Sequence, residues 1–246
     1  MSYHWNWGIL LSPVSTGEPT TYLGWLLSGL WVTVTVSLSA WVIALVVGSF
    51  FGVLRTVPNK WASGVGTVYV AIFRNIPLIV QFFIWYLVIP ELLPVSIGNS
   101  FKQLPPGAQF FSSSIVCLGL FTAARVCEQV RSGINALPRG QRAAGLAVGF
   151  TQWQTYRYVL LPVAYRIIVP PLTSEFLNIF KNSAVASTIG LLDLSAQARQ
   201  LVDYTSQTYE SFIAVTVAYM LINLIVMQLM RWVELKARLP GYIGGK

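Results

Sequence analysis

The sequence predicts an all-α membrane protein that crosses the bilayer five times. Of the 246 residues, 55% are hydrophobic and only 10% are charged, whereas soluble domains carry roughly 25% charged residues. The apolar residues gather in five long stretches, and a helix needs about 20 such residues to cross a bilayer. These stretches are continuous rather than alternating, which favours helices over the short strands of a membrane barrel.

The predicted spans follow one another near residues 24–54, 66–90, 109–128, 164–190 and 211–233. The first, second and fifth exceed the required length, and the third is adequate. The fourth has the least distinct boundaries because it contains Pro170, Pro171, Glu175 and Lys181. Residues 91–108, between the second and third spans, are rich in turn-forming residues, and we expect a short external loop there.

The distribution of basic residues predicts the orientation of the chain. Residues 1–54 contain no Lys or Arg, and the second loop contains only Lys102. Arg55 and Lys60 follow the first span, and the third loop holds Arg131, Arg139, Arg142 and Arg157. Basic loops face the cytoplasm, so we expect the N-terminus outside and the C-terminus inside. The net charge of +8 follows from this topology, which argues against a nucleic-acid partner.

A long basic insertion, residues 129–163, separates the third and fourth spans. Leu137-Pro138 is expected to end one helix and begin another, and Gly149 is placed to end that second helix as a C′ glycine. Small apolar residues recur on one face of it, at Ala143, Ala144, Ala147 and Val148. Such a face suits docking into the groove of a partner, and the alternative is packing against the chain's own bundle.

The second half of this insertion predicts another short helix. Thr151 and Gln154 have the spacing of a capping box. Trp153, Tyr156 and Leu160 would share one face of the helix, and Leu161-Pro162 would end it.

Ionisable residues within the predicted spans are candidates for function, since burying charge in a bilayer is costly. Arg74 and Asn75 precede a helix-breaking Pro77, and Gln81 is expected on the same helical face as Arg74. A cation here would suit an acidic substrate, or it would make an interhelical contact. Arg125 and Glu128 are spaced to pair with each other. Lys181, Asn182 and Ser183, together with Glu175, predict a pathway lining or helix–helix contacts.

The sequence shows no cluster of residues typical of a catalytic site. It contains no Gly-x4-Gly-Lys-Ser/Thr phosphate loop, and its only histidine is His4. We therefore expect no catalytic residues, no metal site and no cofactor in this chain. A membrane enzyme is disfavoured, and a passive channel or a scaffold remains as the alternative to a transporter. The two cysteines, Cys117 and Cys127, are expected to act as small apolar residues in the third span.

The insertion resembles the EAA loop of permease subunits in bacterial ATP-binding-cassette importers. The family pattern is Glu-Ala-Ala, three residues, Gly, nine residues and Ile-x-Leu-Pro. The matching stretch here begins with Gly140 and Gln141, has Ala143, Ala144 and Gly145 at the Glu-Ala-Ala positions, and continues with Gly149, Val159, Leu161 and Pro162. Ala143 stands where the family has Glu, so the resemblance implies docking to an ATPase through shape rather than through that charge.

Other segments extend the resemblance over nearly the whole chain. Residues 73–81 and 170–190 resemble polar amino-acid permeases, and residues 121–131 and 156–162 resemble the permeases of glutamate/aspartate importers. The resemblance implies the five-span fold of a type I ABC importer permease with a cytoplasmic coupling helix. It implies uptake of polar, acidic amino acids, with another polar amino acid as the alternative.

The resemblance also implies the partners and the location of each part of the chain. The partners would be a second homologous permease, a cytoplasmic ATPase dimer that binds the ATP, and a periplasmic solute-binding protein. In a bacterial inner membrane, residues 1–23 would form a periplasmic arm, residues 24–233 the permease domain and residues 234–246 a cytoplasmic tail.

Overall fold

The computed structural model describes residues 3–237, and over this range the protein is built from helices. A single isolated β-bridge joins Pro13 to Thr21 in the described residues. The predicted all-α class is therefore confirmed. Most of the predicted tail, residues 238–246, lies outside the described residues.

The chain forms two compact units. The first unit contains Met1–Ala40, Pro77–Leu118 and Ile179–Ile225, and the second contains Trp41–Ile76, Gly119–Asn178 and Val226–Lys246. Because each unit draws on separate stretches of the sequence, residues far apart along the chain meet within it.

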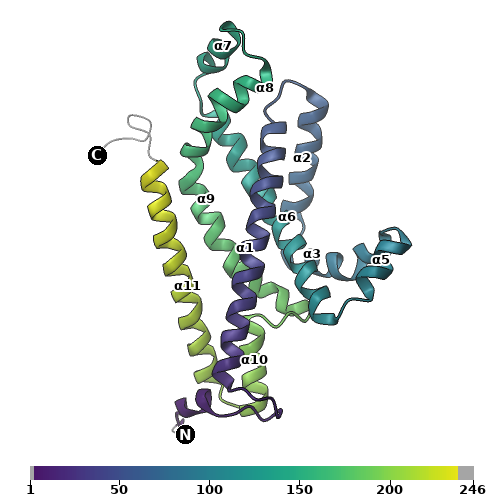
Figure 1. Ribbon diagram of the computed structural model, residues 1–246, viewed down its shortest axis with the longest axis vertical. Coiled ribbons are helices and arrows are strands. Elements are labelled where there is room, and N and C mark those ends of the chain that lie inside the picture. Colours follow the sequence, from purple (N-terminus) through teal and green to yellow (C-terminus); the bar gives the residue numbers. More distant parts are fainter. Residues whose placement is uncertain (1–2, 238–246) are drawn as a thin grey trace. The chain divides into compact units, whose positions relative to one another are not determined.

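Within residues 3–237, four helical segments are long and apolar enough to cross a membrane (Figure 1). They are α1 (Tyr22–Leu54), α6 (Pro106–Asn135), the continuous segment Gln152–Ile189 and α11 (Thr208–Ala237). A fifth span is present if the broken pair Lys60–Asn75 and Leu78–Leu92 counts as one crossing. The predicted spans thus correspond to helical segments, and most of these extend beyond the predicted boundaries.

The second predicted span is not a continuous helix. Helix α2 (Lys60–Asn75) ends before Ile76 and Pro77, which both have extended backbone. Proline lacks an N–H and disfavours helical backbone in the residue before it. The chain then continues as α3 (Leu78–Phe83), the π-helical η2 (Ile84–Val88) and α4 (Ile89–Leu92). The expectation that Arg74 and Gln81 share one helical face was wrong because it required an unbroken helix.

The region predicted as a simple external loop contains a helix of its own. Helix α5 (Val95–Lys102) occupies its middle, and α6 begins at Pro106, inside the predicted loop. Lys102 Nζ lies 2.6 Å from Glu91 Oε1. A proline is favourable at the start of a helix because its missing N–H has no partner to lose there.

The prolines of the fourth span do not interrupt it. Helix α9 (Leu161–Ser183) contains Pro170 and Pro171, and the 3₁₀-helical η4 (Ala184–Ile189) follows directly. The segment ends at Gly190, whose φ of 105° stops the helix. Helix α10 (Leu194–Thr205) comes next, before the last span.

Small residues bring α1, α6 and α9 close together within the second unit. A Cβ on Gly48 would lie 2.6 Å from Val126 Cβ, and one on Gly52 would lie 2.6 Å from Val130 Cβ. A Cβ on Gly133 would lie 2.4 Å from Ile168 Cγ2. Close approach at small residues is the usual mode of helix packing in membranes, and it fixes the helices that carry the candidate site.

The first unit contains a buried carboxylate at the start of α10. Asp193 caps this helix by accepting a hydrogen bond from the Ala196 N–H at 2.9 Å. Its other oxygen accepts one from the Tyr219 hydroxyl at 3.2 Å. Helix α1 supports the same turn, because the Leu194 N–H donates to Thr33 Oγ1 at 3.1 Å.

Candidate functional site

Helix α7 (Arg139–Ala147) lies in the predicted coupling loop and ends in a Schellman motif. The Phe150 N–H donates to the Gly145 carbonyl at 3.1 Å, and the Gly149 N–H donates to the Leu146 carbonyl at 3.1 Å. Gly149 has a φ of 87°, in the left-handed region where only glycine is free of steric cost. The predicted turn at Gly149 is confirmed.

The second arm of the loop begins with the predicted capping box. Gln154 N–H donates to Thr151 Oγ1 at 3.2 Å, and Thr151 N–H donates to Gln154 Oε1 at 2.8 Å. The two arms meet where Gly145 faces Thr155, and a Cβ at Gly145 would lie 2.9 Å from Thr155 Cγ2. The loop is therefore a tight helical hairpin, which we call the coupling hairpin (residues 139–162).

The coupling hairpin continues directly into the fourth span. The expectation that Leu161-Pro162 ends the second helix was wrong. Helix α8 (Gln152–Thr155) passes into the π-helical η3 (Tyr156–Leu160) and then into α9. The Leu161 N–H bonds to the Tyr156 carbonyl, so one wider turn precedes the proline and the helix survives.

The predicted aromatic face of this arm is divided. Tyr156 and Leu160 are each only 3% exposed, and the Tyr156 hydroxyl donates to the Thr56 carbonyl at 2.8 Å. Trp153, in contrast, is 63% exposed. Tyr156 thus fixes the hairpin to the connection between α1 and α2, and Trp153 faces outward.

The outer face of the hairpin is apolar and uncovered. Val148 is 73% exposed, and the other members of the predicted small-residue face are exposed as well: Ala143, Ala144 and Ala147. This face does not pack against the chain's own bundle. Of the remaining predicted coupling residues, Gly145 is buried, Gln141 and Leu161 are partly buried, and the exposed ones are Gly140, Gly149 and Pro162. Exposed apolar patches on a protein surface are candidates for interaction sites.

A cluster of charges forms the second feature of this unit. The carboxylate of Glu128 lies 2.6 Å from Arg55 Nη1, 3.4 Å from Arg131 Nη1 and 3.7 Å from Arg74 Nη1. The Arg55 side chain is only 8% exposed, so its charge depends on Glu128 for compensation.

A second ion pair adjoins the first. Arg125 Nη1 lies 3.7 Å from Glu175 Oε2, and the Arg125 guanidinium lies 5.0 Å from the centre of the Phe121 ring. The structure thus pairs Arg125 with Glu175 rather than with Glu128. A polar cavity of about 300 Å³ separates these groups, and we call it the charged cavity; it is lined by Arg74, Phe121, Arg125, Glu128, Gln129 and Glu175.

The charged cavity holds only part of the predicted substrate pathway. Arg74 and Glu175 line it, and Asn75 is the exposed last residue of α2. Gln81 is buried in α3, which packs against η4 in the first unit. In that same unit Lys181 is exposed, Asn182 is partly buried, and the buried Ser183 donates to the Phe180 carbonyl at 2.8 Å.

Sequence reasoning missed the role of Arg55. It was assigned only to a basic loop, although it directly follows a helix of 33 residues, which is longer than a bilayer crossing requires. Glu128 comes from a different helix, and no local pattern relates the two. In residues 3–237 no group of three His, Cys, Asp or Glu side chains is arranged to hold a metal.

Comparisons with known proteins place these features in context. Residues 44–239 match the family described as "Binding-protein-dependent transport system inner membrane component". The chain is 64% identical to the glutamate/aspartate import permease protein GltJ of Escherichia coli K12, over an alignment of 247 positions that covers 100% of both proteins. It is 30% identical to the glutamate/aspartate import permease protein GltK of E. coli O6:H1, over 82% of this chain and 88% of that protein. A solved amino acid ABC transporter with histidines matches with a TM-score of 0.72 and 28% identity, over 87% of this chain and 95% of that one.

Proposed function

We propose that the chain is a permease subunit of an ABC importer for glutamate and aspartate, because it belongs to the family of inner membrane components of binding-protein-dependent transport systems. The observation that carries the transport role is the coupling hairpin, which is rigidly joined to a span and apolar on its outer face. The full-length identity of 64% to GltJ supports the acidic substrate.

The hairpin would transmit movement from a partner ATPase to the spans. Its outer face would sit in a groove of the ATPase, with Trp153 and the small residues of α7 as contacts. Because η3 and α9 form one continuous helix, a displacement of the hairpin moves the span directly. ATP would bind to the partner. It would shift the permease between two states only because its affinity for the importer differs between these states.

The charged cavity would serve the substrate as it crosses. Its network contains four guanidinium groups (Arg55, Arg74, Arg125 and Arg131) and two carboxylates (Glu128 and Glu175), an excess of two positive charges. An acidic amino acid brings two carboxylates and one ammonium group. Arg74 and Arg125 would therefore contact the carboxylates, and Glu175 would contact the ammonium group.

The partners and topology follow from the same proposal. GltJ and GltK are both named as glutamate/aspartate import permeases, which supports a second homologous permease subunit beside this chain. A periplasmic binding protein would deliver the substrate, and a cytoplasmic ATPase dimer would supply the energy.

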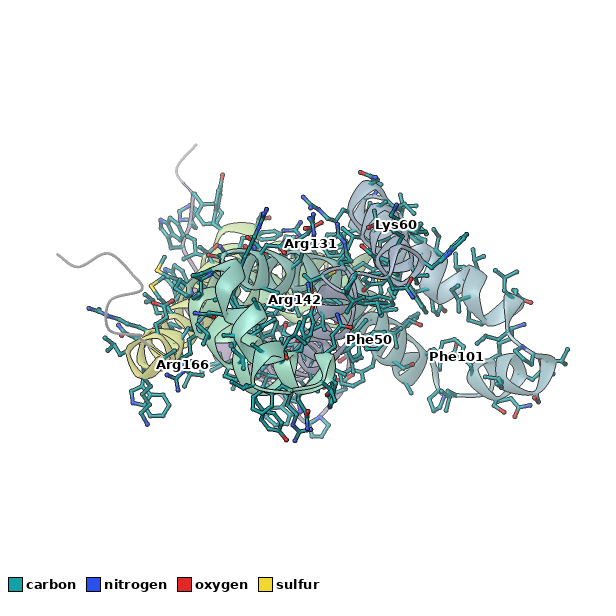
Figure 2. The ribbon with its side chains drawn as sticks, turned by 90° about the horizontal axis from the view of Figure 1, so that it is seen from above. Phe50, Lys60, Phe101, Arg131, Arg142 and Arg166 are labelled. Atoms are coloured by element: carbon teal, nitrogen blue, oxygen red, sulfur yellow. The ribbon has the colours of Figure 1, made fainter. Side chains whose placement is uncertain are left out.

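The end of the second unit that carries α7 also carries basic side chains. Figure 2 looks onto this end, where Lys60, Arg131 and Arg142 are labelled. The positive-inside rule supports placing this end in the cytoplasm of a bacterial inner membrane. The N-terminal arm, residues 1–23, would then lie in the periplasm and the tail after residue 233 in the cytoplasm.

Reconstitution of the complete importer tests the proposal. The chain, its ATPase, a second permease and the binding protein are placed in vesicles, and uptake of labelled glutamate, aspartate, glutamine, histidine and arginine is measured with and without ATP. We expect ATP-dependent uptake of glutamate and aspartate, each inhibiting the other, and none with a hydrolysis-deficient ATPase. Preferential uptake of a neutral or basic amino acid would overturn the substrate assignment, and ATP-independent uptake would overturn the importer mechanism.

A further inference from the structure

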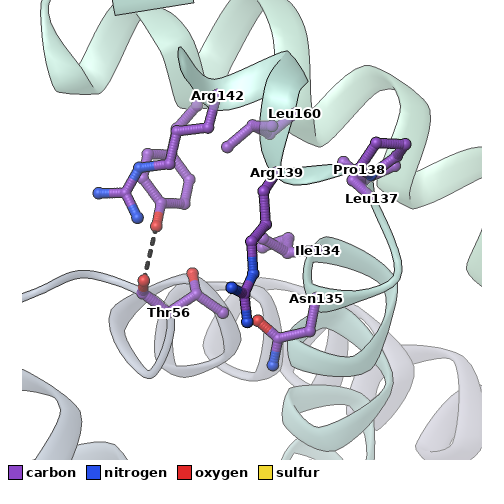
Figure 3. A pocket seen from close by; sticks show the side chains of 9 residues that line it. Thr56, Ile134, Asn135, Leu137, Pro138, Arg139, Arg142 and Leu160 are labelled. Carbon is purple, nitrogen blue, oxygen red and sulfur yellow. Dashed lines mark hydrogen bonds between the residues drawn. The ribbon is translucent and has the colours of Figure 1, made fainter.

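A second cavity lies beneath the coupling hairpin, and we call it the hairpin cavity. It has a volume of about 480 Å³. Its floor is apolar and buried, formed by Ile134, Leu137 and Leu160. Its rim is polar and includes Asn135, Arg139 and Arg142 (Figure 3). An apolar floor with a cationic rim suits an amphiphilic anion.

The two arginines of the rim have no carboxylate partner. Figure 3 shows Arg139 and Arg142 extending from α7 toward Thr56 and Asn135. Neither arginine forms an ion pair within the part of the chain that the structure describes, whereas Arg55 and Arg131 both meet Glu128. No Asp or Glu lines the cavity. Arg142 is held over the Tyr156 ring at 5.9 Å, which orients its charge without neutralising it.

The start of α7 adds to this positive potential. Pro138 provides no side-chain cap, and the first turn contains no acidic residue. The N–H groups at a helix start attract anions, and this helix start borders the cavity because Pro138 and Arg139 both line it.

The position of the cavity along α6 indicates the source of the anion. Helix α6 has 30 residues, so it is about 45 Å long, compared with about 30 Å for the hydrocarbon core of a bilayer. Ile134 and Asn135 are its last two residues. Arg125, Glu128 and Arg131 precede them on α6, so the cavity lies at the polar end of the helix, past the apolar stretch that suits the hydrocarbon core.

We propose that the hairpin cavity binds the phosphate headgroup of an anionic phospholipid from the cytoplasmic leaflet. Anionic lipids of that leaflet attract basic side chains beside the membrane. Arg139 and Arg142 contact the phosphate, and the apolar floor accepts the start of the glycerol and acyl groups. The lipid braces α7 against the end of α6 and the connection after α1. The inference rests on the proposed function in taking this end of the chain as cytoplasmic.

Lipid binding to the purified importer, without ATP or substrate, tests the proposal. Native mass spectrometry measures the affinity for dihexanoyl-phosphatidylglycerol, for dihexanoyl-phosphatidylcholine and for inorganic phosphate. The test variant is Arg139→Gln/Arg142→Gln, and the control is Arg157→Gln, an exposed arginine outside the cavity. Each lost arginine should weaken phosphatidylglycerol binding roughly fivefold, and the double variant about thirtyfold, from about 1 kcal/mol per basic residue.

The control variant and the Arg139→Lys/Arg142→Lys variant, which keeps both charges, should bind phosphatidylglycerol as the original chain does. If the glutamine variant fails to fold, the phosphatidylglycerol affinity of this lysine variant tests the proposal instead. Equal affinity for phosphatidylglycerol and phosphatidylcholine, or an unchanged affinity in the double glutamine variant, overturns the proposal.

Two other outcomes also overturn the lipid assignment. Inorganic phosphate that binds as tightly as the lipid indicates a site for a free anion. Loss of the ATPase from the purified double variant indicates that the arginines hold an acidic side chain of that partner. Lipid binding is measured without transport. If the original importer binds the lipid but takes up no glutamate, that result contradicts only the proposed function.

Discussion

Gly149 carries the turn of the coupling hairpin because its φ of 87° excludes side chains branched at Cβ. Gly149→Val should displace Phe150 and the second arm, so ATP-driven uptake should fall at least about tenfold while the protein still reaches the membrane. Uptake in vesicles and the amount of inserted protein are the measurements. Gly64→Val is the matched control, because Gly64 lies in α2 with open space around it. Uptake of Gly149→Val at the original rate would show that the turn is dispensable.

Arg74 is the most exposed arginine of the charged cavity, with a side chain 55% exposed. If it contacts a substrate carboxylate, Arg74→Ala should reduce uptake of glutamate and aspartate roughly tenfold at low substrate concentration, as expected for a lost hydrogen bond between charged groups. Lys60→Ala removes an exposed cation outside this cavity and should leave uptake unchanged. Equal rates for Arg74→Ala and the original chain would assign Arg74 a structural role.

Asp193 makes the stability of the first unit depend on pH. Burial raises the pKa of Asp193 to about 6, so the folded protein holds this proton more tightly than the unfolded chain. The resulting contribution to the free energy of unfolding is complete below about pH 4 and is lost as the pH rises through about 6. From the size of the pKa shift, the loss amounts to about 3 kcal/mol.

The variant Asp193→Asn isolates this contribution. Asparagine still caps α10 but cannot ionise, so its advantage over the original chain should grow between pH 4 and pH 8. Thermal unfolding in detergent at both pH values gives the comparison. Parallel changes in the two proteins would mean that Asp193 does not ionise in this range.

At the level of elements, the coupling hairpin depends on the contact between its two arms. Gly145→Ala brings a Cβ within 2.9 Å of Thr155 Cγ2, which should separate the arms and weaken the stimulation of ATP hydrolysis by the loaded binding protein several-fold. Thr155→Ala removes the obstructing atoms, so Gly145→Ala/Thr155→Ala should recover much of the stimulation. The ATPase activity of the three variants is the measurement. If the second substitution does not restore the stimulation of ATP hydrolysis, coupling does not depend on the contact between Gly145 and Thr155.

The elements that sequence predicted best have purely local signals. The capping box at Thr151 and the turn at Gly149 each depend on residues within one or two helical turns, and both are present. Pro77 and Pro162 have the same local chemistry but different outcomes. The helix breaks before Pro77, while a π-helical turn allows it to continue through Pro162. Both prolines are exposed, so the difference lies in the π-helical turn before Pro162, which no local sequence pattern predicted.

At the scale of the whole molecule, the order of the spans was predictable because hydrophobicity and length determine membrane crossing. The charged cavity was not predictable as a unit. Its ion pairs join Arg55 to Glu128 and Arg125 to Glu175, and they form only after three helices pack. Sequence identified Arg125, Glu128 and Glu175 as intramembrane charges, but it missed Arg55 and did not predict which charges pair.

The central claim is that the outer face of the coupling hairpin docks on an ATPase in the cytoplasm. Val148→Cys tests it, because Val148 is 73% exposed and both natural cysteines are buried. Val95→Cys, at a residue 77% exposed on α5, is the matched control on the side expected to face the periplasm. A thiol-specific cross-linker is applied to the assembled importer with and without ATP.

The account predicts that Val148→Cys cross-links to the ATPase, that the yield changes with ATP, and that Val95→Cys gives no such product. The account would be contradicted if Val148→Cys failed to reach the ATPase in an importer that still transports, or if both cysteines cross-linked to it equally.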